Sequence, residues 1–169
     1  MSRLGEGTSL KIILPLTLAI IDGLVIRSQE EKFVIPLGQV FEIVQVDNQE
    51  IEEFSGGARL FKLRGDVLPL FYLNNKLGAN LEDTSRNTVI VVKGLSHVFG
   101  VVVDDIVIQQ QIVIKKLGED IKNRKGVMGS SIMGDGRPSL ILDLLELFKN
   151  DLKKSSGYKK FLKEQNIAS

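Results

Sequence analysis

The chain has 169 residues with no cysteine and one histidine, which excludes disulfides, thiolate metal sites and any site built on several imidazoles. Its formal net charge is +1, so charge gives no reason to expect nucleic acid or an anionic membrane as a partner. Apolar residues make up 43% of the chain and charged residues 25%, a mixture typical of globular domains rather than disordered segments.

The first apolar run covers residues 10–21 and is broken by Lys11 and Pro15. It is too short to cross a bilayer, which takes about 20 consecutive apolar residues. No small-residue cleavage site precedes the polar pair Asp22-Gly23, so a cleaved leader is not expected either. We therefore predict a buried strand in this run, and no direct membrane insertion.

Most of the chain has apolar residues that alternate with a period of two, which indicates β-strands. A polar stretch at 79–87 is predicted to be a linker or loop between two groups of strands. In the first group, Arg64-Gly65-Asp66 is predicted to form a hairpin turn, because glycine readily adopts the positive φ that such turns need. The expected strands are 24–28, 33–37, 40–46, 59–63, 67–73, 88–92, 98–103, 106–108 and 112–114.

The main helical pattern lies near the end of the chain. Leu144, Leu147, Phe148 and Leu152 have the spacing of residues on one helical face. We predict a helix that covers at least Asp143 to Leu152. The lysine-rich stretch that follows is predicted to continue as a solvated helical tail.

The chain contains an internal repeat. Phe33 to Val40 matches Phe99 to Ile106, and Gly65 to Leu70 matches Gly136 to Ile141. We call the shift from Phe33 to Phe99 the first offset and the slightly longer shift from Gly65 to Gly136 the second offset. Two similar small β-units explain this pattern. Each unit has about 60–70 residues, a size at which one core is marginal alone, so we expect the units to pack together as one folding unit.

Three features resemble functional motifs but lack the partners that the chemistry needs. Gly5-Glu-Gly-Thr8 has no Lys-Ser/Thr of a phosphate loop. Asp104 and Asp105 would point to opposite faces of a strand, which favours a solvated strand end over a metal site. His97 falls in a predicted hairpin turn without an acidic partner. We therefore expect no catalytic residue, no metal and no cofactor.

Three segments together resemble the CheW-like domain: Glu31 to Ile43, Phe61 to Leu70, and Gly126 to Gly136. The lead-in Gly5 to Ile20 is similar to the last strand of the ATP-binding domain of the chemotaxis histidine kinase CheA, where it runs into the regulatory domain. The resemblance implies an all-β fold of two intertwined five-stranded SH3-like β-barrels with a C-terminal helix.

The same resemblance implies a domain plan. The end of the kinase ATP-binding domain and a linker would occupy 1–16, and the CheW-like regulatory domain would occupy 17–148. The first barrel is expected at about 24–78 and the second at about 88–144. A basic helical tail, at 149–169, departs from the usual ending of the family.

The resemblance also implies a scaffolding role without catalysis. The expected partners are the adaptor CheW, the cytoplasmic tip of chemoreceptors and the rest of the CheA kinase, in the cytoplasm at membrane-associated chemoreceptor arrays. There the domain would couple receptor state to kinase activity. One alternative is a stand-alone adaptor of the CheW type. Another is a small-ligand-binding β-barrel, which would need a sizeable apolar cavity with a few polar groups.

Candidate partner-binding residues lie near the predicted turns, because exposed apolar patches usually mark interfaces. Glu42 and Arg64 recur together in the CheW-like pattern, and we predict that their side chains lie on one face within salt-bridge distance. An arginine suits this role because its planar fork binds a carboxylate through two bonds. The full candidate set is Val40, Phe41, Glu42, Ile43 and Arg64 in the first unit, and Val127, Met128 and Met133 in the second.

Overall fold

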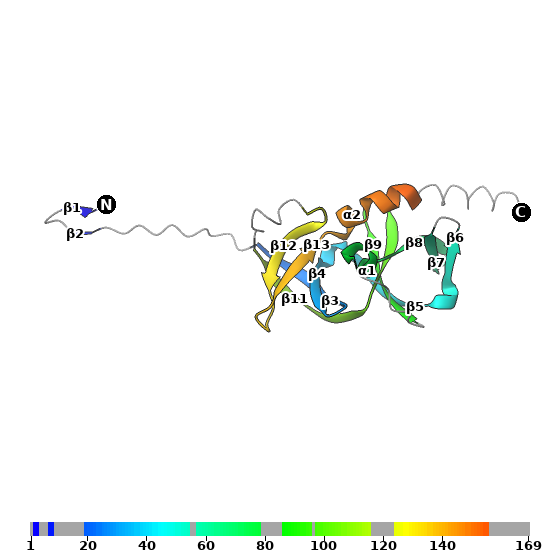
Figure 1. Cartoon of the computed structure of the whole chain (residues 1–169), viewed down its shortest axis with the longest axis horizontal. Coiled ribbons are helices and arrows are strands. Elements are labelled where there is room, and N and C mark those ends of the chain that lie inside the picture. Colours follow the sequence, from blue (N-terminus) through cyan, green and yellow to red (C-terminus); the bar gives the residue numbers. More distant parts are fainter. Residues whose placement is uncertain are drawn as a thin grey trace, which may run out of the picture.

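The computed structural model describes residues 2–3, 7–8, 19–54, 57–78, 86–95, 97–115 and 124–155 (Figure 1). Three predicted segments lie wholly or partly outside these ranges. They are the end of the kinase domain, of which only 2–3 and 7–8 are described, the linker at 79–85, and the tail beyond 155. In the lead-in, β1 (Ser2–Arg3) and β2 (Gly7–Thr8) pair antiparallel with each other. Most of the first apolar run, predicted to be a buried strand, lies outside the described residues. Its described end is a strand from Ala19 onward, in which Ile20 is 56% exposed and Ile21 is half-buried, so this end is a strand but is not fully buried.

The rest of the described chain is mostly strand, which confirms the all-β prediction. The strands form a six-stranded sheet and a five-stranded sheet, at the right and left of Figure 1. They are β3 (Ala19–Ser28), β4 (Glu31–Pro36), β5 (Val40–Asp47), β6 (Ile51–Phe54), β7 (Ala58–Leu63), β8 (Asp66–Tyr72), β9 (Arg86–Lys93), β10 (Val98–Val103), β11 (Asp105–Ile114), β12 (Val127–Ile132) and β13 (Pro138–Leu142).

The strand order shows that the two halves of the chain exchange strands. The six-stranded sheet has the order β5-β9-β10-β8-β7-β6, and the five-stranded sheet has the order β11-β3-β4-β13-β12. The strands β3 and β4 therefore pair with strands of the second half, and β9 and β10 pair with strands of the first. The units are intertwined as expected, but the expected barrel limits of about 24–78 and 88–144 do not coincide with the sheets. The strand β6 adds a sixth strand to one sheet.

The hydrogen-bonded register reproduces the repeat. In the β3–β4 hairpin Ile26 lies opposite Phe33, and applying the first offset to both residues gives Val92 opposite Phe99 in the β9–β10 hairpin. Because the register matches residue for residue, these two hairpins are equivalent elements of the two halves.

The exchange of strands between the sheets follows the same repeat. The parallel pair β4–β13 places Val34 opposite Ile141, and the parallel pair β10–β8 places Gly100 opposite Leu70. The first offset relates Val34 to Gly100, and the second offset relates Leu70 to Ile141. Each half therefore donates one hairpin to the sheet of the other half, which gives the two small units a common core.

Two short helices follow equivalent strands. The helix α1 (Leu73–Leu77) follows β8, and α2 (Leu144–Leu147) follows β13, with helical backbone again at 149–155. The Asp143 side chain caps α2 by accepting a hydrogen bond from the Glu146 amide at 3.1 Å. The predicted C-terminal helix is thus confirmed, with a turn at Phe148; α2 and residues 149–155 are called the C-terminal helix below. Two 3₁₀ turns, η1 (Leu37–Gln39) and η2 (Asn48–Glu50), flank β5.

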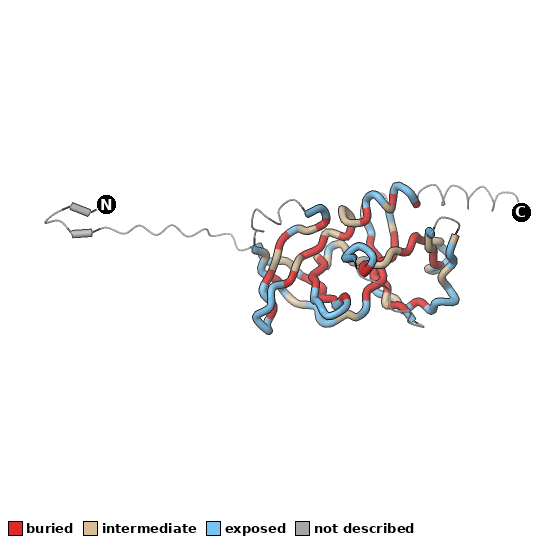
Figure 2. The backbone as a smooth tube through the Cα atoms, in the orientation of Figure 1, coloured by how far each residue is buried: buried red, intermediate tan, exposed pale blue. Residues whose placement is uncertain are grey.

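The central strands are buried on both faces. In β9, Ile90 and Val92 belong to a core shared by the two sheets, whereas Val89 and Val91 belong to the interior of the six-stranded sheet. A smaller cluster, which includes Val34, fills the interior of the five-stranded sheet. This double burial explains why such strands are continuously apolar, and Figure 2 shows the buried residues concentrated along them.

An aromatic cluster joins the C-terminal helix to the six-stranded sheet. The ring of Phe148 stacks on Phe71 with centroids 5.2 Å apart, and both rings make edge contacts with Phe99 at 6.1 and 5.7 Å. Phe99 and Phe148 are almost fully buried. The helix is therefore part of the folded core and not an appendage.

Candidate functional site

The outer face of β5 carries exposed apolar side chains. A bulge between Val40 and Glu42 turns the strand where it begins to pair with β9. Phe41, the extra residue of this bulge, is 54% exposed, and Ile43 after it is 43% exposed. The Lys93 ammonium lies 5.0 Å from the centre of the Phe41 ring, so a cation covers part of this apolar surface.

The predicted ion pair between Glu42 and Arg64 is confirmed. The Arg64 Nη2 donates to Glu42 Oε2 at 2.7 Å, with the carboxylate side chain 17% exposed and the guanidinium side chain 74% exposed. The neighbours Phe41 and Ile43 point to the opposite face of β5, as the alternation of a strand requires. The Glu42 carboxylate therefore lies on the other face of β5 from Phe41 and Ile43, and the exposed Arg64 guanidinium brings the charge of the pair to solvent.

The turn that carries Arg64 holds it in an unusual backbone conformation. Arg64 has φ 53° and Gly65 has φ 94°, the two positive values of a type I′ hairpin. Glycine adopts this conformation freely, whereas a residue with a Cβ pays about 1–2 kcal/mol. Asparagine or glycine would suit the turn better, so turn formation alone does not explain the arginine.

We call Phe41, Glu42, Ile43 and Arg64 the β5 surface. All four candidate residues lie on β5 or bind to it, with the two apolar side chains on one face of the strand and the ion pair reaching it from the β7–β8 hairpin. Val40 lies beside them but is half-buried, because it packs against the core shared by the two sheets. As an interface residue it contributes to the shape of the surface more than to its exposed area.

The candidates of the second unit do not join this surface. Val127 is half-buried against the shared core, and Met128 is 49% exposed on β12 in the other sheet. Met133 is only 6% exposed and packs in the interior of the five-stranded sheet, so its selection as an exposed interface residue is wrong. Its backbone closes the β12–β13 turn by bonding to Arg137 and Gly136, which directs the side chain inward.

A polar cluster between the sheets escaped the sequence analysis. Asp104, expected to be a solvated strand end, accepts hydrogen bonds from the Asn74 amide group at 2.9 Å and from the Gln29 backbone amide. Asn74 also accepts a hydrogen bond from the buried Ser28 hydroxyl. No local pattern links these residues, which lie 30 to 75 positions apart in the chain.

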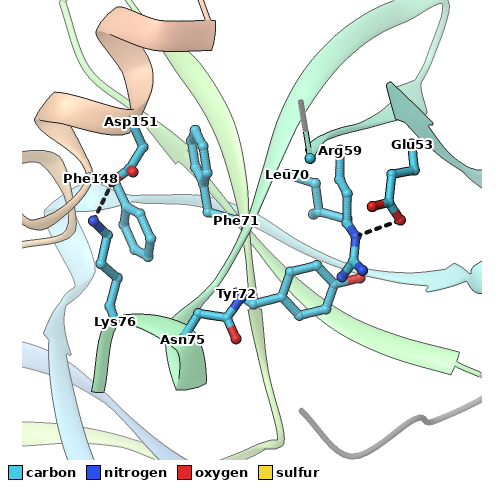
Figure 3. A pocket seen from close by; sticks show the side chains of 10 residues that line it. Glu53, Arg59, Leu70, Phe71, Tyr72, Asn75, Lys76, Phe148 and Asp151 are labelled. Atoms are coloured by element: carbon cyan, nitrogen blue, oxygen red, sulfur yellow. Dashed lines mark hydrogen bonds and ion pairs between the residues drawn. The ribbon is translucent and has the colours of Figure 1, made fainter. Parts of the chain in front are cut away.

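A recess of about 330 Å³ opens between β7, β8, α1 and the C-terminal helix (Figure 3). Its apolar part consists of Leu70 and the aromatic rings of Phe71, Tyr72 and Phe148. Two ion pairs flank these rings, Arg59 with Glu53 on one side and Lys76 with Asp151 on the other. A second recess of about 320 Å³ lies by the β3–β4 and β12–β13 turns. The described residues hold no group of three or more metal-ligating side chains.

The comparisons with known proteins agree on one family. A model of the CheW-like domain matches residues 22–152. The chemotaxis protein CheA of Klebsiella aerogenes is 36% identical over 149 residues, which are 86% of this chain and 23% of that protein. The sensor histidine kinase CheAY of Helicobacter pylori is 40% identical over 145 residues, which are 85% of this chain and 18% of that protein.

A solved structure shows the same fold. The scaffolding protein TtCheW from Thermoanaerobacter tengcongensis aligns with a TM-score of 0.65 at 20% sequence identity, covering 77% of this chain and 93% of that chain. Sequence and fold together show that this chain belongs to the CheW-like domain family. It spans about a fifth of the length of the curated relatives described above. Within the described ranges, no helix is long and apolar enough to span a bilayer.

Proposed function

We propose that this domain is the regulatory and scaffolding module of a bacterial chemotaxis histidine kinase of the CheA type. The observation that carries this proposal is the 36% and 40% identity to CheA and CheAY over 86% and 85% of the chain. The resemblance of the lead-in, Gly5 to Ile20, to the end of a CheA ATP-binding domain points the same way. The site of action would be the cytoplasm, at receptor arrays.

The module acts by position and not by chemistry. It binds the adaptor CheW and the cytoplasmic tip of chemoreceptors, and it follows the catalytic domain of the kinase directly in the chain. Receptor and adaptor contacts then bias where the catalytic domain sits, which is a shift in the population of two arrangements. The domain alone is proposed to have no kinase activity.

The β5 surface is the proposed contact for the adaptor. Phe41 and Ile43 supply apolar area, and the ion pair of Glu42 with Arg64 supplies a charged group of defined position. Charged groups beside apolar neighbours favour partner selection and register over raw affinity. The positive φ of Arg64 supports this role, because strained conformations tend to persist where a side chain is needed for function.

The test measures binding of the chain to purified CheW and to a chemoreceptor fragment. Arg64→Ala should weaken adaptor binding much more than it lowers the unfolding free energy. The matched control is Arg86→Ala, because Arg86 forms a 2.9 Å ion pair with Asp47 elsewhere on β5 and β9. Equal loss of binding in both variants, or no binding of the parent chain, would refute the proposed contact.

A stand-alone adaptor of the CheW type is the second candidate, favoured by the structural likeness to a scaffolding protein. The two roles differ in whether the chain replaces CheW. In a mixture of chemoreceptor and CheA without CheW, an adaptor restores receptor control of the kinase. A kinase module instead competes with that CheA for receptor binding. A separate assay without CheA tests catalysis: the chain alone should neither hydrolyse ATP nor carry phosphate on His97.

A further inference from the structure

The recess between β7, β8 and the C-terminal helix has an aromatic floor. Phe71 is half-buried and stacks on the fully buried Phe148 at 5.2 Å, which leaves part of the Phe71 ring open to the recess. The volume of about 330 Å³ is at the lower end for ligand sites, and suits one large side chain rather than a cofactor. Burial of such a side chain on aromatic rings is the main apolar gain that the recess offers.

One wall of the recess carries an ion pair whose carboxylate is partly exposed. Lys76 Nζ lies 2.5 Å from Asp151 Oδ2, with the two side chains 31% and 29% exposed. The Oδ2 atom is buried beside this ammonium, so the exposed part of Asp151 lies elsewhere on its side chain. Because a carboxylate has about four acceptor positions on its two oxygens, Asp151 can accept an additional ammonium or guanidinium donor.

The opposite wall carries donors. Arg59 binds Glu53 through Nε at 3.3 Å, and its guanidinium lies 4.8 Å from the centre of the Tyr72 ring (Figure 3). Among the hydrogen bonds of the described residues, none uses the two terminal nitrogens of Arg59. The aromatic ring holds the guanidinium plane in place, so its fork is preorganised for a carboxylate.

The charges of the recess cancel, since two cations face two anions, so neither a purely acidic nor a purely basic partner is favoured. We propose that the recess docks a protein segment in which a large apolar side chain lies between a basic and an acidic residue. The apolar side chain packs on Phe71. The basic residue binds Asp151, and the acidic residue binds Arg59.

This docking site is separate from the β5 surface. It is built from β6, β7, β8, α1 and the C-terminal helix, whereas the β5 surface is built from β5 and the β7–β8 turn. The recess also differs from the β5 surface in what it recognises, since its ligand needs charges of both signs around one apolar group. The proposed docking in the recess does not depend on which adaptor binds the β5 surface.

The experiment titrates the full chain, labelled with ¹⁵N, with capped pentapeptides that differ in one feature each. The probe is Ac-Glu-Ala-Phe-Ala-Lys-NH₂, and a second probe has the order of the two charged residues reversed. The controls replace Glu by Gln, Lys by Gln, both together, or Phe by Ala. The readout is the dissociation constant from amide shifts at Arg59, Tyr72 and Lys76.

We expect one of the two mixed-charge probes to bind best. Each replacement of a charge by Gln should weaken binding about threefold, as for a partly exposed ion pair. Replacement of Phe by Ala should weaken it more than about tenfold, because the main apolar contact is lost. In the protein, Asp151→Asn should weaken the probe but not the peptide without Lys, and Arg59→Gln should weaken the probe but not the peptide without Glu.

Matched control variants come from an ion pair of the five-stranded sheet. Asp105 accepts from Arg27 at 2.9 Å, so Asp105→Asn and Arg27→Gln remove the same charges far from the recess. They should leave probe binding unchanged. The proposal is overturned if the neutral peptide binds as well as the probe, if the control variants weaken it equally, or if no peptide shifts these amides. None of these outcomes bears on adaptor binding by the β5 surface.

Discussion

The strands β5 and β11 occupy equivalent places in the two halves but present different chemistry to solvent. In β5 Glu42 lies opposite Val91, and in β11 Ile108 lies opposite Val25, so the first offset relates the two pairs. Both strands have a bulge just before these residues. The backbone of the repeat is therefore the same down to the irregular residue.

The side chains at these equivalent places have diverged. Where β5 has Glu42, which is held by Arg64, β11 has Ile108, which is 52% exposed, followed by three glutamines. Among the residues that face the interior, Val46 and its counterpart Ile112 are both apolar and buried, whereas half-buried Val44 corresponds to the polar Gln110. The repeat therefore preserves the register and the fully buried core, whereas the more accessible residues differ and can serve a different partner in each half.

The largest expected effect concerns the helices that follow equivalent strands. Leu73 and Leu144, related by the second offset, are both fully buried, but Leu77 is 39% exposed where Phe148 is 1% exposed. Phe148→Ala should lower the unfolding free energy by about 3–5 kcal/mol, because it empties the aromatic cluster. Leu77→Ala should cost about 1 kcal/mol. Urea unfolding measures both, and similar losses would contradict the contrast.

The second effect concerns small and large residues that change places between the halves. The five-stranded sheet has Gly23 and Val34 where the six-stranded sheet has Val89 and Gly100. A Cβ on Gly100 would lie 2.7 Å from side-chain atoms of Phe61 and Val89. Gly100→Val should therefore destabilise the domain by about 1–3 kcal/mol through overpacking.

A double-mutant cycle sharpens this contrast. Val89→Gly removes one of the side chains that the new valine at Gly100 would meet. The double variant should be more stable than the sum of the single changes predicts, by more than about 1 kcal/mol. Strict additivity in urea unfolding would show that the clash at Gly100 comes from Phe61 and Leu70 alone.

The third effect concerns the two equivalent hairpin turns. The β7–β8 turn consists of two residues, Arg64 and Gly65, both at positive φ. The equivalent β12–β13 connection is longer and spans 133–137. The unfolding free energy of Arg64→Asn should be no more than about 0.5 kcal/mol below that of the parent, because asparagine tolerates this conformation. Arg64→Ala should be less stable than Arg64→Asn. Both should lose adaptor binding, and a stable variant with full binding would remove the arginine from the interface.

The smallest effect is a pH dependence in the second turn. A hydrogen bond from the Lys32 ammonium at 2.7 Å, with help from the Arg137 amide, lowers the pKa of Asp135 below its usual value. A depressed folded-state pKa stabilises the fold above the unfolded value of about 3.9, and this gain is lost as pH falls through the folded value. Lys32→Met should remove part of it.

The measurement compares unfolding free energies of the parent and Lys32→Met as a function of pH. The difference between them should be small at pH 7, because the pair is exposed, and should shrink below about pH 4. A difference that grows on acidification would mean that Lys32 stabilises the turn through its methylene chain rather than through Asp135.

Local patterns in the sequence determined the elements. A period of two marks the strands, the spacing of Leu144 and Phe148 marks the C-terminal helix, and Gly65 marks the tight turn. The first offset also predicted that two hairpins are equivalent. These features depend on neighbouring residues or on matches between segments, which can be read along one chain. The Glu42–Arg64 pair came from the family resemblance.

Only the tertiary structure decided how the elements combine. Strands of one half pair with strands of the other, and this exchange places Ser28, Asn74 and Asp104 in one polar cluster. The tertiary structure also brings Arg59 and Asp151, which lie far apart in the chain, to opposite walls of one recess. Met133 looked like an exposed turn residue but is buried, because the turn folds its side chain back onto the sheet. Contacts between distant residues depend on which sheet edges meet, and no local period carries that information.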